Sequence, residues 1–481
     1  MRFLLATLLM ASRVSGAAPQ AGITDEGPAP PRPNLVLILA DDAGIGDFGC
    51  YGQQKIRTPN IDRLAAEGLR FTQFYAGGAV CVPSRCALMT GKHLGHAALR
   101  ENVTQPLPPE ESTLAELLRS AGQRTACIGK WALGNSVRQG SPLEQGFDTY
   151  FGFIDQVQAH RYFPGFLLKD DERVPFADNE RARTRYSQAL FTDEALRFLE
   201  ANRERPFFLY LAYCLPHADL DVPEESIAPY RAAGWPETPY VERGERLYND
   251  QPTPRAAYAG MVSRLDQEVG RVLDRLRELD LERDTLVVFS SDNGPSREGG
   301  GDPDFFDSNG PFRGGKGELY EGGLRAPFLA RWPGRIAAGT SDLPCASWDV
   351  LATCAELAGF PVPQGNDGLS LAPTLLGRPG EQVVHEYLYW EHMPRGASHS
   401  QALRRGDWKA LRLGVQARSP RVELYDLATD PGEANDQAAA KPEVVAELTG
   451  LMNKAHVMDP KSPLLLREMK GGLERPGRKG R

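Results

Sequence analysis

The hydrophobic positions of this chain fall into short continuous runs that alternate with longer amphipathic segments. Residues 35–40 contain no polar position, which is the pattern of a strand buried on both faces. Strand-like runs of this kind span residues 35–40, 125–129, 206–213 and 285–290. Helical spacing of apolar positions is found over residues 58–68, 113–120 and 256–279. The alternation predicts an α/β domain with a large, mixed and mostly parallel sheet.

The first predicted helix carries its own start signals. Thr58 is expected to be the N-cap residue, and Pro59 suits the first turn because its fixed φ is helical. Ile61 and Leu64 then fall on one apolar face, and Gly68 marks the end of the helix. We therefore expect this helix to pack against the sheet by that face.

The pattern changes after about residue 360. Residues 383–391, 401–413 and 421–427 are expected to form antiparallel strands with polar turns between them, and residues 441–456 an amphipathic helix. This pattern predicts a smaller α+β C-terminal domain. The predicted organisation is a signal peptide over 1–18, a linker over 19–33, a large α/β domain over 34–360, the smaller domain over 361–465 and a disordered tail over 466–481.

The N-terminal residues have the features of a secretory leader. Met1-Arg2 precedes an apolar run over 3–10, and small residues at 15–18 offer a cleavage site. The run is too short to span a bilayer, and we expect an exported protein without a transmembrane segment. A net charge of −8 and the lack of a sustained basic stripe argue against a nucleic-acid partner.

Seven cysteines are scattered along the chain without the paired C-x-x-C spacing of a zinc site. Export would permit disulfides, although their pairing cannot be read from the sequence. Residues 44–49 match G-x-G-x-x-G after a strand, but Asp41, Asp42 and Asp47 would repel a pyrophosphate there. No convincing helix follows, so we reject a dinucleotide site.

Groups of similar chemistry stand at the ends of two predicted strands. Asp41 and Asp42 follow the first strand, and Asp292 and Asn293 follow the strand over 285–290. Because ligands bind at the carboxyl ends of strands in open α/β sheets, these oxygens are expected to meet. Such a shell suits Ca²⁺ or Mg²⁺ better than zinc. Each pair taken alone is most often just an ordinary turn.

Residues 81–85 read Cys-Val-Pro-Ser-Arg and resemble the C-x-P-x-R signature of the type I sulfatases. In that family the cysteine is oxidised to formylglycine, whose hydrate attacks sulfur with one hydroxyl and expels sulfate by collapse of the other. The alternative for Cys81 is a buried or disulfide-bonded cysteine beside a helix start.

Further segments carry the same resemblance. Residues 129–134, Gly-Lys-Trp-Ala-Leu-Gly, resemble the second sulfatase signature, except that Ala132 replaces its histidine. Pro216-His217 and the segment 312–317 around Lys316 match the family's second histidine and further lysine. The chain is identified as a member of the sulfatase family, over roughly residues 34–427.

The resemblance implies a fold, a metal and a set of roles. The fold is an alkaline-phosphatase-like sandwich, and the metal is Ca²⁺, with Mg²⁺ less favoured. The implied metal ligands are Asp41, Asp42, Asp292, Asn293 and the formylglycine from Cys81. Lys130 and Lys316 would contact sulfate, His217 would protonate the leaving alcohol, and Arg85 would anchor the formylglycine oxygens. A formylglycine-generating or sulfatase-maturing enzyme is an implied partner.

His160 is the candidate to replace the missing histidine. It lies in a segment, 152–164, that resembles secreted bacterial carbohydrate sulfatases whose second signature also lacks histidine. The alternative is a structural histidine among aromatic residues. The remaining histidines have weaker claims: His93 and His96 follow the Cys81 helix, His385, His392 and His399 lie in the smaller domain, and His456 is expected at the surface.

The sequence therefore predicts an arylsulfatase-like enzyme that hydrolyses a sulfate ester of a saccharide or small molecule. A formylglycine-dependent phosphodiesterase or phosphonate monoester hydrolase is the second hypothesis. A decayed sulfatase that only binds sulfated glycans is the third, motivated by Ala132. The sugar, the sulfated position, endo or exo action and the oligomeric state are not encoded in any motif that we can read.

Overall fold

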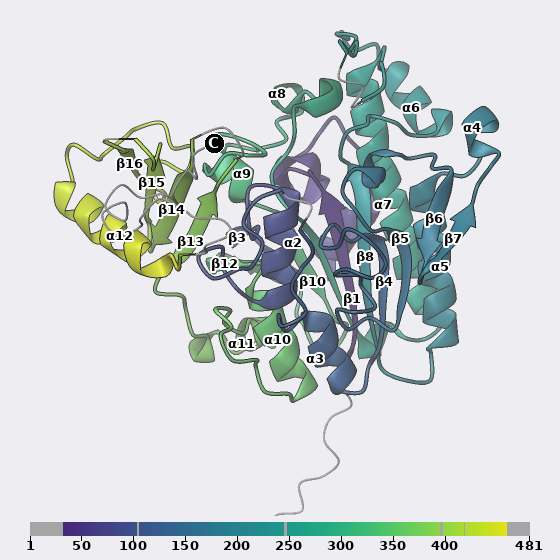
Figure 1. Ribbon diagram of the computed structural model, residues 1–481, viewed down its shortest axis with the longest axis horizontal. Coiled ribbons are helices and arrows are strands. Elements are labelled where there is room, and N and C mark those ends of the chain that lie inside the picture. The colour runs from purple at the N-terminus through teal and green to yellow at the C-terminus, as the bar shows by residue number, and fades with distance from the viewer. Residues whose placement is uncertain (1–31, 103–104, 245–247, 395–397, 418, 459–481) are drawn as a thin grey trace, which may run out of the picture. The chain divides into compact units, whose positions relative to one another are not determined.

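The computed structural model describes residues 32–102, 105–244, 248–394, 398–417 and 419–458 (Figure 1). The predicted signal peptide over 1–18, nearly all of the linker over 19–33 and the tail over 466–481 lie outside these residues. Among the described residues, no helix combines the length and apolar character that a membrane span requires.

The first strand, β1 (Asn34–Asp41), is buried along its whole length. Its side chains alternate between two hydrophobic clusters, because successive residues of a strand point to opposite faces of the sheet. Leu35, Leu37 and Leu39 belong to one cluster. Val36 and Ile38 belong to the other. This double burial explains why the sequence over 35–40 is continuously apolar.

Ten strands form the main sheet over the described residues. In sheet order they are β11 (Gly339–Ser341), β2 (Leu69–Phe71), β10 (Phe328–Arg331), β9 (Thr285–Ser291), β1, β8 (Phe207–Pro216), β4 (Arg124–Lys130), β5 (Thr149–Phe153), β6 (Phe166–Lys169) and β7 (Glu172–Pro175). The central block β9-β1-β8-β4-β5 is parallel, whereas β10, β6 and β7 pair antiparallel with their neighbours. The four strands predicted from sequence are adjacent in this block, and the mixed, mostly parallel sheet is confirmed.

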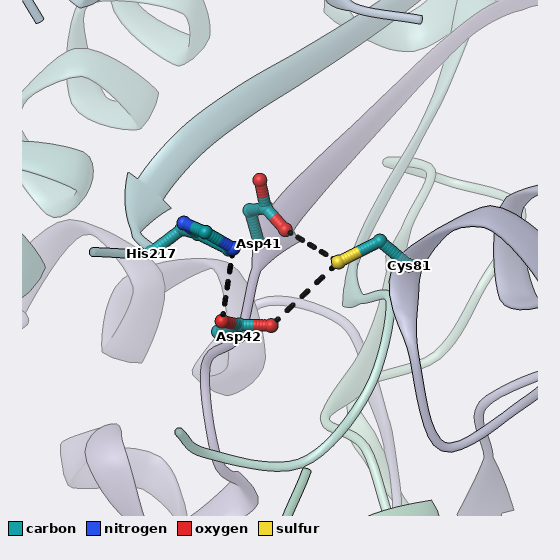
Figure 2. A group of neighbouring side chains, drawn as sticks. All are labelled: Asp41, Asp42, Cys81 and His217. Atoms are coloured by element: carbon teal, nitrogen blue, oxygen red, sulfur yellow. Dashed lines mark hydrogen bonds and ion pairs between the residues drawn. The ribbon is translucent and has the colours of Figure 1, made fainter. Parts of the chain in front are cut away.

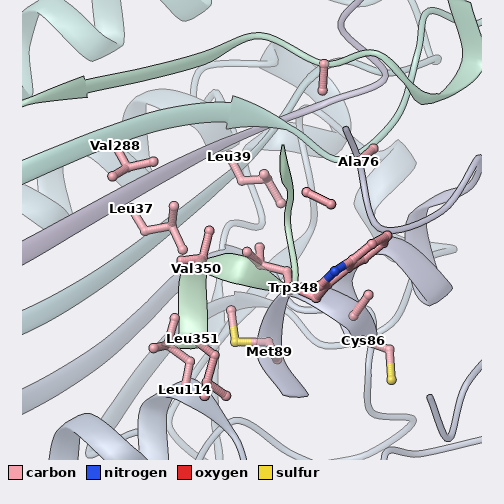
Figure 3. Close-up of a cluster of buried hydrophobic side chains, with 14 of the residues drawn as sticks. Leu37, Leu39, Ala76, Cys86, Met89, Leu114, Val288, Trp348, Val350 and Leu351 are labelled. Atoms are coloured by element: carbon pink, nitrogen blue, oxygen red, sulfur yellow. The ribbon is translucent and has the colours of Figure 1, made fainter. Parts of the chain in front are cut away.

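Helices cover both faces of the sheet. On the Leu37 face pack α2 (Cys81–Thr90), α3 (Leu114–Ser120) and α10 (Asp349–Ala358), which contribute Met89, Leu114 and Leu351 to the cluster shown in Figure 3. The opposite face carries α1 (Pro59–Ala66), α5 (Ser187–Ala201) and α7 (Pro254–Glu278). The three helices predicted from sequence are α1, α3 and α7.

Shorter elements connect this framework. They are β3 (Phe74–Tyr75) paired with β12 (Cys345–Ala346), helices α4 (Asn179–Ala182), α6 (Glu224–Arg231), α8 (Pro303–Phe306), α9 (Glu321–Leu324) and α11 (Ala372–Leu375), and 3-10 turns η1 (Ile45–Asp47), η2 (Gly49–Tyr51), η3 (Gln158–His160), η4 (Glu282–Asp284), η5 (Glu298–Gly300) and η6 (Pro379–Glu381). The G-x-G-x-x-G segment leads into the short 3-10 turns η1 and η2 and opens no α-helix, in agreement with the rejection of a dinucleotide site.

The C-terminal strands form a separate antiparallel sheet. Its order is β13 (Leu388–His392), β14 (Ser400–Arg405), β15 (Trp408–Leu413) and β16 (Arg421–Asp426), and α12 (Pro442–Ala455) packs against it. The single strand predicted over 401–413 is wrong, because this segment is a hairpin. Its turn is Gly406-Asp407, where Gly406 takes a left-handed conformation with φ +58°. Apolar alternation continues on both sides of that turn and hides it from a pattern search.

The start of α1 differs from its prediction. Thr58 occupies the N-cap position, but its side chain makes no capping hydrogen bond. The capping acceptor is instead Asp266 of α7, whose Oδ1 receives the backbone N–H groups of Asn60 (2.9 Å) and Ile61 (2.8 Å). A residue more than two hundred positions away therefore completes the helix end that sequence assigned to Thr58.

All seven cysteines lie in described residues, and all carry free thiols. Six of them are buried, and Cys50 is half-buried. No disulfide therefore joins any of these cysteines, although export would permit one.

Candidate active site

The predicted site residues meet at the carboxyl edge of the parallel block. Asp41 ends β1, Lys130 ends β4, His217 follows β8, and Asp292 and Asn293 follow β9. Parallel strands place these ends on the same edge of the sheet, so the fold brings together residues that are far apart in the chain. The residues that follow the predicted strands therefore lie close together in the structure, as expected from the sequence.

Cys81 is the first residue of α2 and lies among these carboxylates. Its Sγ is 3.4 Å from Asp41 Oδ1 and 3.8 Å from Asp42 Oδ1, and Figure 2 shows the group together with His217. Burial raises the pKa of the Cys81 thiol well above its usual range. An unmodified Cys81 is therefore a neutral thiol at neutral pH and a poor nucleophile, because the thiolate is the reactive form.

Arg85 lies one turn further along α2 and is fully buried. Its Nε and Nη2 are 2.9 and 2.8 Å from Asp292 Oδ2, and Nη1 donates to the Lys130 carbonyl at 2.8 Å. Nη2 also lies 3.5 Å from Asp41 Oδ1. The guanidinium thus connects α2 with the ends of three strands and fixes the position of Cys81.

Lys130, which is buried, and Lys316, which is partly buried, each contact one of the carboxylates. Lys130 Nζ donates to Asp41 Oδ2 at 2.6 Å. Lys316 Nζ donates to Asp42 Oδ2 at 2.8 Å and lies 3.1 Å from His217 Nε2. Burial lowers the pKa of each lysine, but the neighbouring carboxylates more than offset this and raise it above its usual range. Both side chains are therefore cations.

The acidic groups differ in their electrostatic surroundings. Burial raises the pKa of Asp41, but Lys130, His217 and Arg85 outweigh that effect and lower it. The pKa of Asp42 is raised, first by burial. That of Asp292 is raised to about 7 by burial and by the charge of Asp41. Clustered carboxylates of this kind are stabilised in their ionised form by a divalent cation.

The donor set fits a hard cation. Asp41, Asp42 and Asp292 supply carboxylate oxygens, and the buried Oδ1 of Asn293 has no hydrogen-bond partner in the described part of the chain. A buried amide oxygen without a donor is costly unless a ligand compensates for it. Oxygen donors of this type are those that Ca²⁺ and Mg²⁺ prefer. A second spatial grouping, of Asp41, Asp42, Cys81 and His217, has potential ligand atoms within 4.8 Å of one another.

His217 presents its Nε2 to the cluster. Nδ1 contacts the Ala218 carbonyl, so this nitrogen carries the proton and Nε2 is left as an acceptor. Nε2 lies 3.5 Å from Asp42 Oδ2 and accepts a hydrogen bond from Lys316 Nζ. Burial, followed by the charge of Lys316, holds the pKa of His217 well below its usual range.

His160 lies directly beside His217. The two imidazole rings are stacked with centroids 4.7 Å apart, and the Tyr248 ring packs on His160 at 5.5 Å. The Nε2 of His160 is buried and has no hydrogen-bond partner among the described residues. Burial, then the charge of Lys130, lowers the pKa of His160 to about 4. Ala132 is also buried, but its methyl side chain has no nitrogen that could accept a proton.

A pocket of about 570 Å³ is lined by His160, His217 and Lys316, together with Tyr248 and Glu298. Sequence reasoning missed Tyr248 and Glu298. Glu298 had a signal, because it follows Asp292 in the same loop, whereas Tyr248 comes from the loop before α7 and carries no motif.

The histidines outside this site have structural contacts. His93 and His96 stack at 4.4 Å and share Asp367, which receives His96 Nδ1 at 2.8 Å. Gly95 N donates to His93 Nδ1 at 3.1 Å. His93 therefore carries its proton on Nε2 and cannot bind a metal through that nitrogen. The prediction of a surface His456 is wrong: it is buried and pairs with Glu391 at 2.9 Å.

Comparison with known families bears on this geometry. Residues 33–360 match the family model described as Sulfatase, and residues 314–457 match the one described as N-sulphoglucosamine sulphohydrolase, C-terminal. The chain belongs to the sulfatase family. On this ground we assign it to the sulfuric ester hydrolases.

Individual relatives agree with this assignment. N-acetylgalactosamine-6-sulfatase of Rattus norvegicus is 35% identical in an alignment of 384 positions, which covers 72% of this chain and 66% of that protein. Arylsulfatase A of Homo sapiens is 34% identical in an alignment of 478 positions, which covers 87% of each chain. The crystal structure of Ps i-CgsB has a TM-score of 0.74 at 28% identity and covers 88% of this chain and 92% of its own. Phosphonate monoester hydrolase of Agrobacterium radiobacter, at 21% identity and TM-score 0.65, shares the fold over 90% of this chain and 99% of its own.

Proposed function

We propose that this sulfatase hydrolyses a sulfate ester of a saccharide outside the cytoplasm, with formylglycine derived from Cys81 as its nucleophile. The observation that carries the proposal is the set of cations and histidines around the Cys81 side chain. Lys130, Lys316 and Arg85 place positive charge on the dianionic transition state of sulfuryl transfer, and stabilisation of developing charge is the largest contribution in many enzymes. His160 and His217 add groups that can move protons.

The proposed nucleophile lies beside the proposed metal ligands, because Cys81 contacts Asp41 and Asp42. The formylglycine hydrate at Cys81 would supply two hydroxyl groups, one for attack on sulfur and one for release of sulfate. Asp41, Asp42, Asp292 and Asn293 would hold Ca²⁺, which the family resemblance favours over Mg²⁺. A bound Ca²⁺ would polarise a sulfate oxygen and raise the acidity of a neighbouring hydroxyl. The neutral thiol of unmodified Cys81 supports the need for this modification.

The protein's own side chains then have distinct tasks. Lys130 and Lys316 bind sulfate oxygens, and Arg85 anchors the oxygens at position 81. His217 Nε2 takes a proton from the Lys316 ammonium 3.1 Å away and passes it to the leaving alcohol, which leaves Lys316 as the neutral amine. His160 is neutral and has an unpartnered Nε2, so it can accept the proton that must leave before sulfate is released. In this way it does the work that Ala132 cannot.

A saccharide substrate is supported by the size of the pocket and by one relative. About 570 Å³ is within the range of sites that hold small-molecule ligands. The crystal structure of Ps i-CgsB in complex with k-i-k-neocarrahexaose matches this chain at 29% identity and TM-score 0.74. We further propose that residues 1–18 direct export, that 34–360 form the catalytic domain and 361–465 the smaller domain, and that a maturing enzyme oxidises Cys81.

The test is an activity screen of protein produced together with a formylglycine-generating enzyme. We expect peptide mass spectrometry to show an aldehyde in place of the Cys81 thiol, and sulfated saccharides to be hydrolysed. Cys81→Ala is the matched control and should be inactive. Equal activity of Cys81→Ala and wild type would contradict the proposed nucleophile.

The same screen separates the alternatives. Faster turnover of phosphodiesters or phosphonate monoesters than of sulfate esters would favour the hydrolase of the second hypothesis. Binding of sulfated glycans without turnover would identify a decayed enzyme. Elemental analysis should find one Ca²⁺ per chain, and stoichiometric zinc without calcium or magnesium would exclude the proposed metal site.

A further inference from the structure

The carboxylate of Glu298 lines the pocket beside Lys316, one of the two lysines proposed to bind sulfate. Glu298 Oε2 receives Lys316 Nζ at 2.7 Å, and Ser296 Oγ donates to the same oxygen at 3.2 Å. Ser296 also accepts the backbone N–H of Glu298 at 3.1 Å, so the side chain and backbone of Glu298 are held in one tight turn. The Glu298 side chain is still 45% exposed, which leaves the carboxylate open to a ligand.

The charges around Glu298 leave it negative when a substrate arrives. Burial raises its pKa, but the charge and hydrogen bond of Lys316 outweigh this and lower it. The pKa of Tyr248 is raised, first by burial and then by the charge of Glu298, which keeps this phenol neutral. The nearby guanidinium of Arg297 is paired with Asp304 at 2.6 Å. Within the part of the chain that the structure describes, Lys316 is the one cation paired with Glu298, so the pocket lining presents a carboxylate without a second counter-ion there.

We infer that Glu298 determines which group the substrate carries next to its scissile sulfate: a hydroxyl or amine is accepted, and a second sulfate or a carboxylate is rejected. This inference rests on the proposed hydrolysis of sulfate esters in this pocket. Two groups that contact the same ammonium lie within about 6 Å of each other, because each contact spans about 3 Å. A sulfate bound by Lys316 therefore lies close to Glu298.

The separation decides whether the repulsion acts. A group that the substrate carries beside its scissile sulfate, on the side of Glu298, lies within the same range of about 6 Å. This is shorter than the Debye length of about 8 Å at physiological salt, so repulsion between Glu298 and a second anion there is not screened away. Like charges juxtaposed in a binding site are a strong means of rejecting a wrong ligand. A hydroxyl or amine at the same position instead donates a charge-assisted hydrogen bond to the carboxylate.

The test compares three aryl sulfates that differ only beside the sulfate: phenyl sulfate, 2-hydroxyphenyl sulfate and 2-carboxyphenyl sulfate. For Glu298→Gln relative to wild type, we expect kcat/KM for 2-carboxyphenyl sulfate to rise at least about tenfold against that for phenyl sulfate. The value for 2-hydroxyphenyl sulfate should fall a few fold against the same reference. Glu318→Gln is the matched control, because the Glu318 side chain also lines the pocket but accepts the Gly315 N–H instead of contacting Lys316 among the described residues, and it should leave all three ratios unchanged.

A change by one common factor on all three substrates would overturn the inference, because it would mean that Glu298 only positions Lys316. The same ligands are also titrated calorimetrically into Cys81→Ala protein with and without Glu298→Gln. We expect the dissociation constants to shift with the same selectivity. If wild type hydrolyses neither these three esters nor any sulfated saccharide, the proposed function fails while the binding ratios still test Glu298. Failure of all three ligands to bind overturns the inference about Glu298, and the sulfated saccharides then test the proposed function separately.

Discussion

At the scale of single residues, the stacked pair of His160 and His217 controls how protons can move in the site. His217 has one nitrogen on the Ala218 carbonyl and the other toward Lys316 and Asp42. His160 keeps a buried nitrogen that has no hydrogen-bond partner in the described segments. Two imidazoles in contact that differ in this way are suited to different steps, one supplying a proton and one accepting it.

His160→Ala is expected to lower kcat by about a hundredfold to ten-thousandfold, the usual contribution of a positioned general base. Burial lowers the pKa of His160 to about 4, so the side chain is neutral and able to accept a proton at pH 7. Steady-state kinetics on formylglycine-bearing protein measures the loss. Ala132→His in the His160→Ala background should recover part of the rate.

His160→Phe separates chemistry from packing. Phenylalanine can stack on His217 as the imidazole does but cannot take a proton, so its kcat should be as low as that of the alanine variant. Wild-type kcat in His160→Phe would show that His160 is a packing residue, and water or His217 would then have to accept the proton.

At the scale of elements, helix α1 depends on a carboxylate of α7. Asp266 accepts two backbone N–H groups at the start of α1 and also binds the Asn60 side chain at 2.9 Å. Its burial leaves water unable to take over these donors. The two helices are therefore joined by a cap as well as by their apolar faces.

Asp266→Ala should lower the free energy of unfolding by about 2 kcal/mol, because it leaves buried helix donors unsatisfied. Asp266→Asn is the matched control, since its amide oxygen can still accept, and should lie closer to wild type. Chemical denaturation of the three proteins measures the difference. An alanine variant as stable as the asparagine variant would show that the cap contributes nothing.

The pH dependence of the same pair has a definite sign. Burial raises the pKa of Asp266 from 3.8 to about 6 in the folded protein. A raised folded pKa means that the native state binds the proton more tightly than the unfolded chain. The stability of wild type relative to Asp266→Asn should therefore increase as pH falls from about 6 to about 4.

At the scale of the whole molecule, buried charges connect the C-terminal sheet with the loop that carries the proposed metal ligands. Lys409 Nζ of β15 lies 2.9 Å from Glu321 Oε1 and 2.9 Å from Glu433 Oε1. Glu321 begins α9, and Gly323 of that helix accepts the Gly294 N–H beside Asn293 at 3.1 Å. The C-terminal sheet thus supports the site through α9.

Lys409→Met should lower the free energy of unfolding by about 3–5 kcal/mol, because it leaves Glu321 and Glu433 buried without their shared cation. Burial raises the pKa of Glu321, but the charges of Lys409 and Arg325 outweigh this and lower it to about 2, whereas burial raises that of Glu433 to about 7. Adding Glu433→Gln to Lys409→Met should recover part of the stability, as it removes one of the two carboxylates. Thermal and chemical unfolding of both variants measure these changes, and a stable single variant would contradict the role of the network.

The sequence by itself determined the class of fold and the chemistry of the site. Apolar runs set the four parallel strands, because burial on both faces is a local property of each strand. The residues that follow a strand are also fixed by chain order. Asp41, Lys130, His217 and Asp292 therefore had to lie at one edge once the strands were parallel. The Cys81 motif added the expectation of a sulfatase, and the family comparison confirms it.

Only the tertiary structure decided which segments without a common pattern touch one another. The stacking of His160 on His217, the contact of Glu298 with Lys316 and the cap supplied by Asp266 each join separate loops or helices. Such contacts depend on how whole elements pack, and local periodicity carries no record of them. The hairpin turn at Gly406 and the burial of His456 were misjudged for the same reason, because the surroundings of a residue are set by segments distant in the chain.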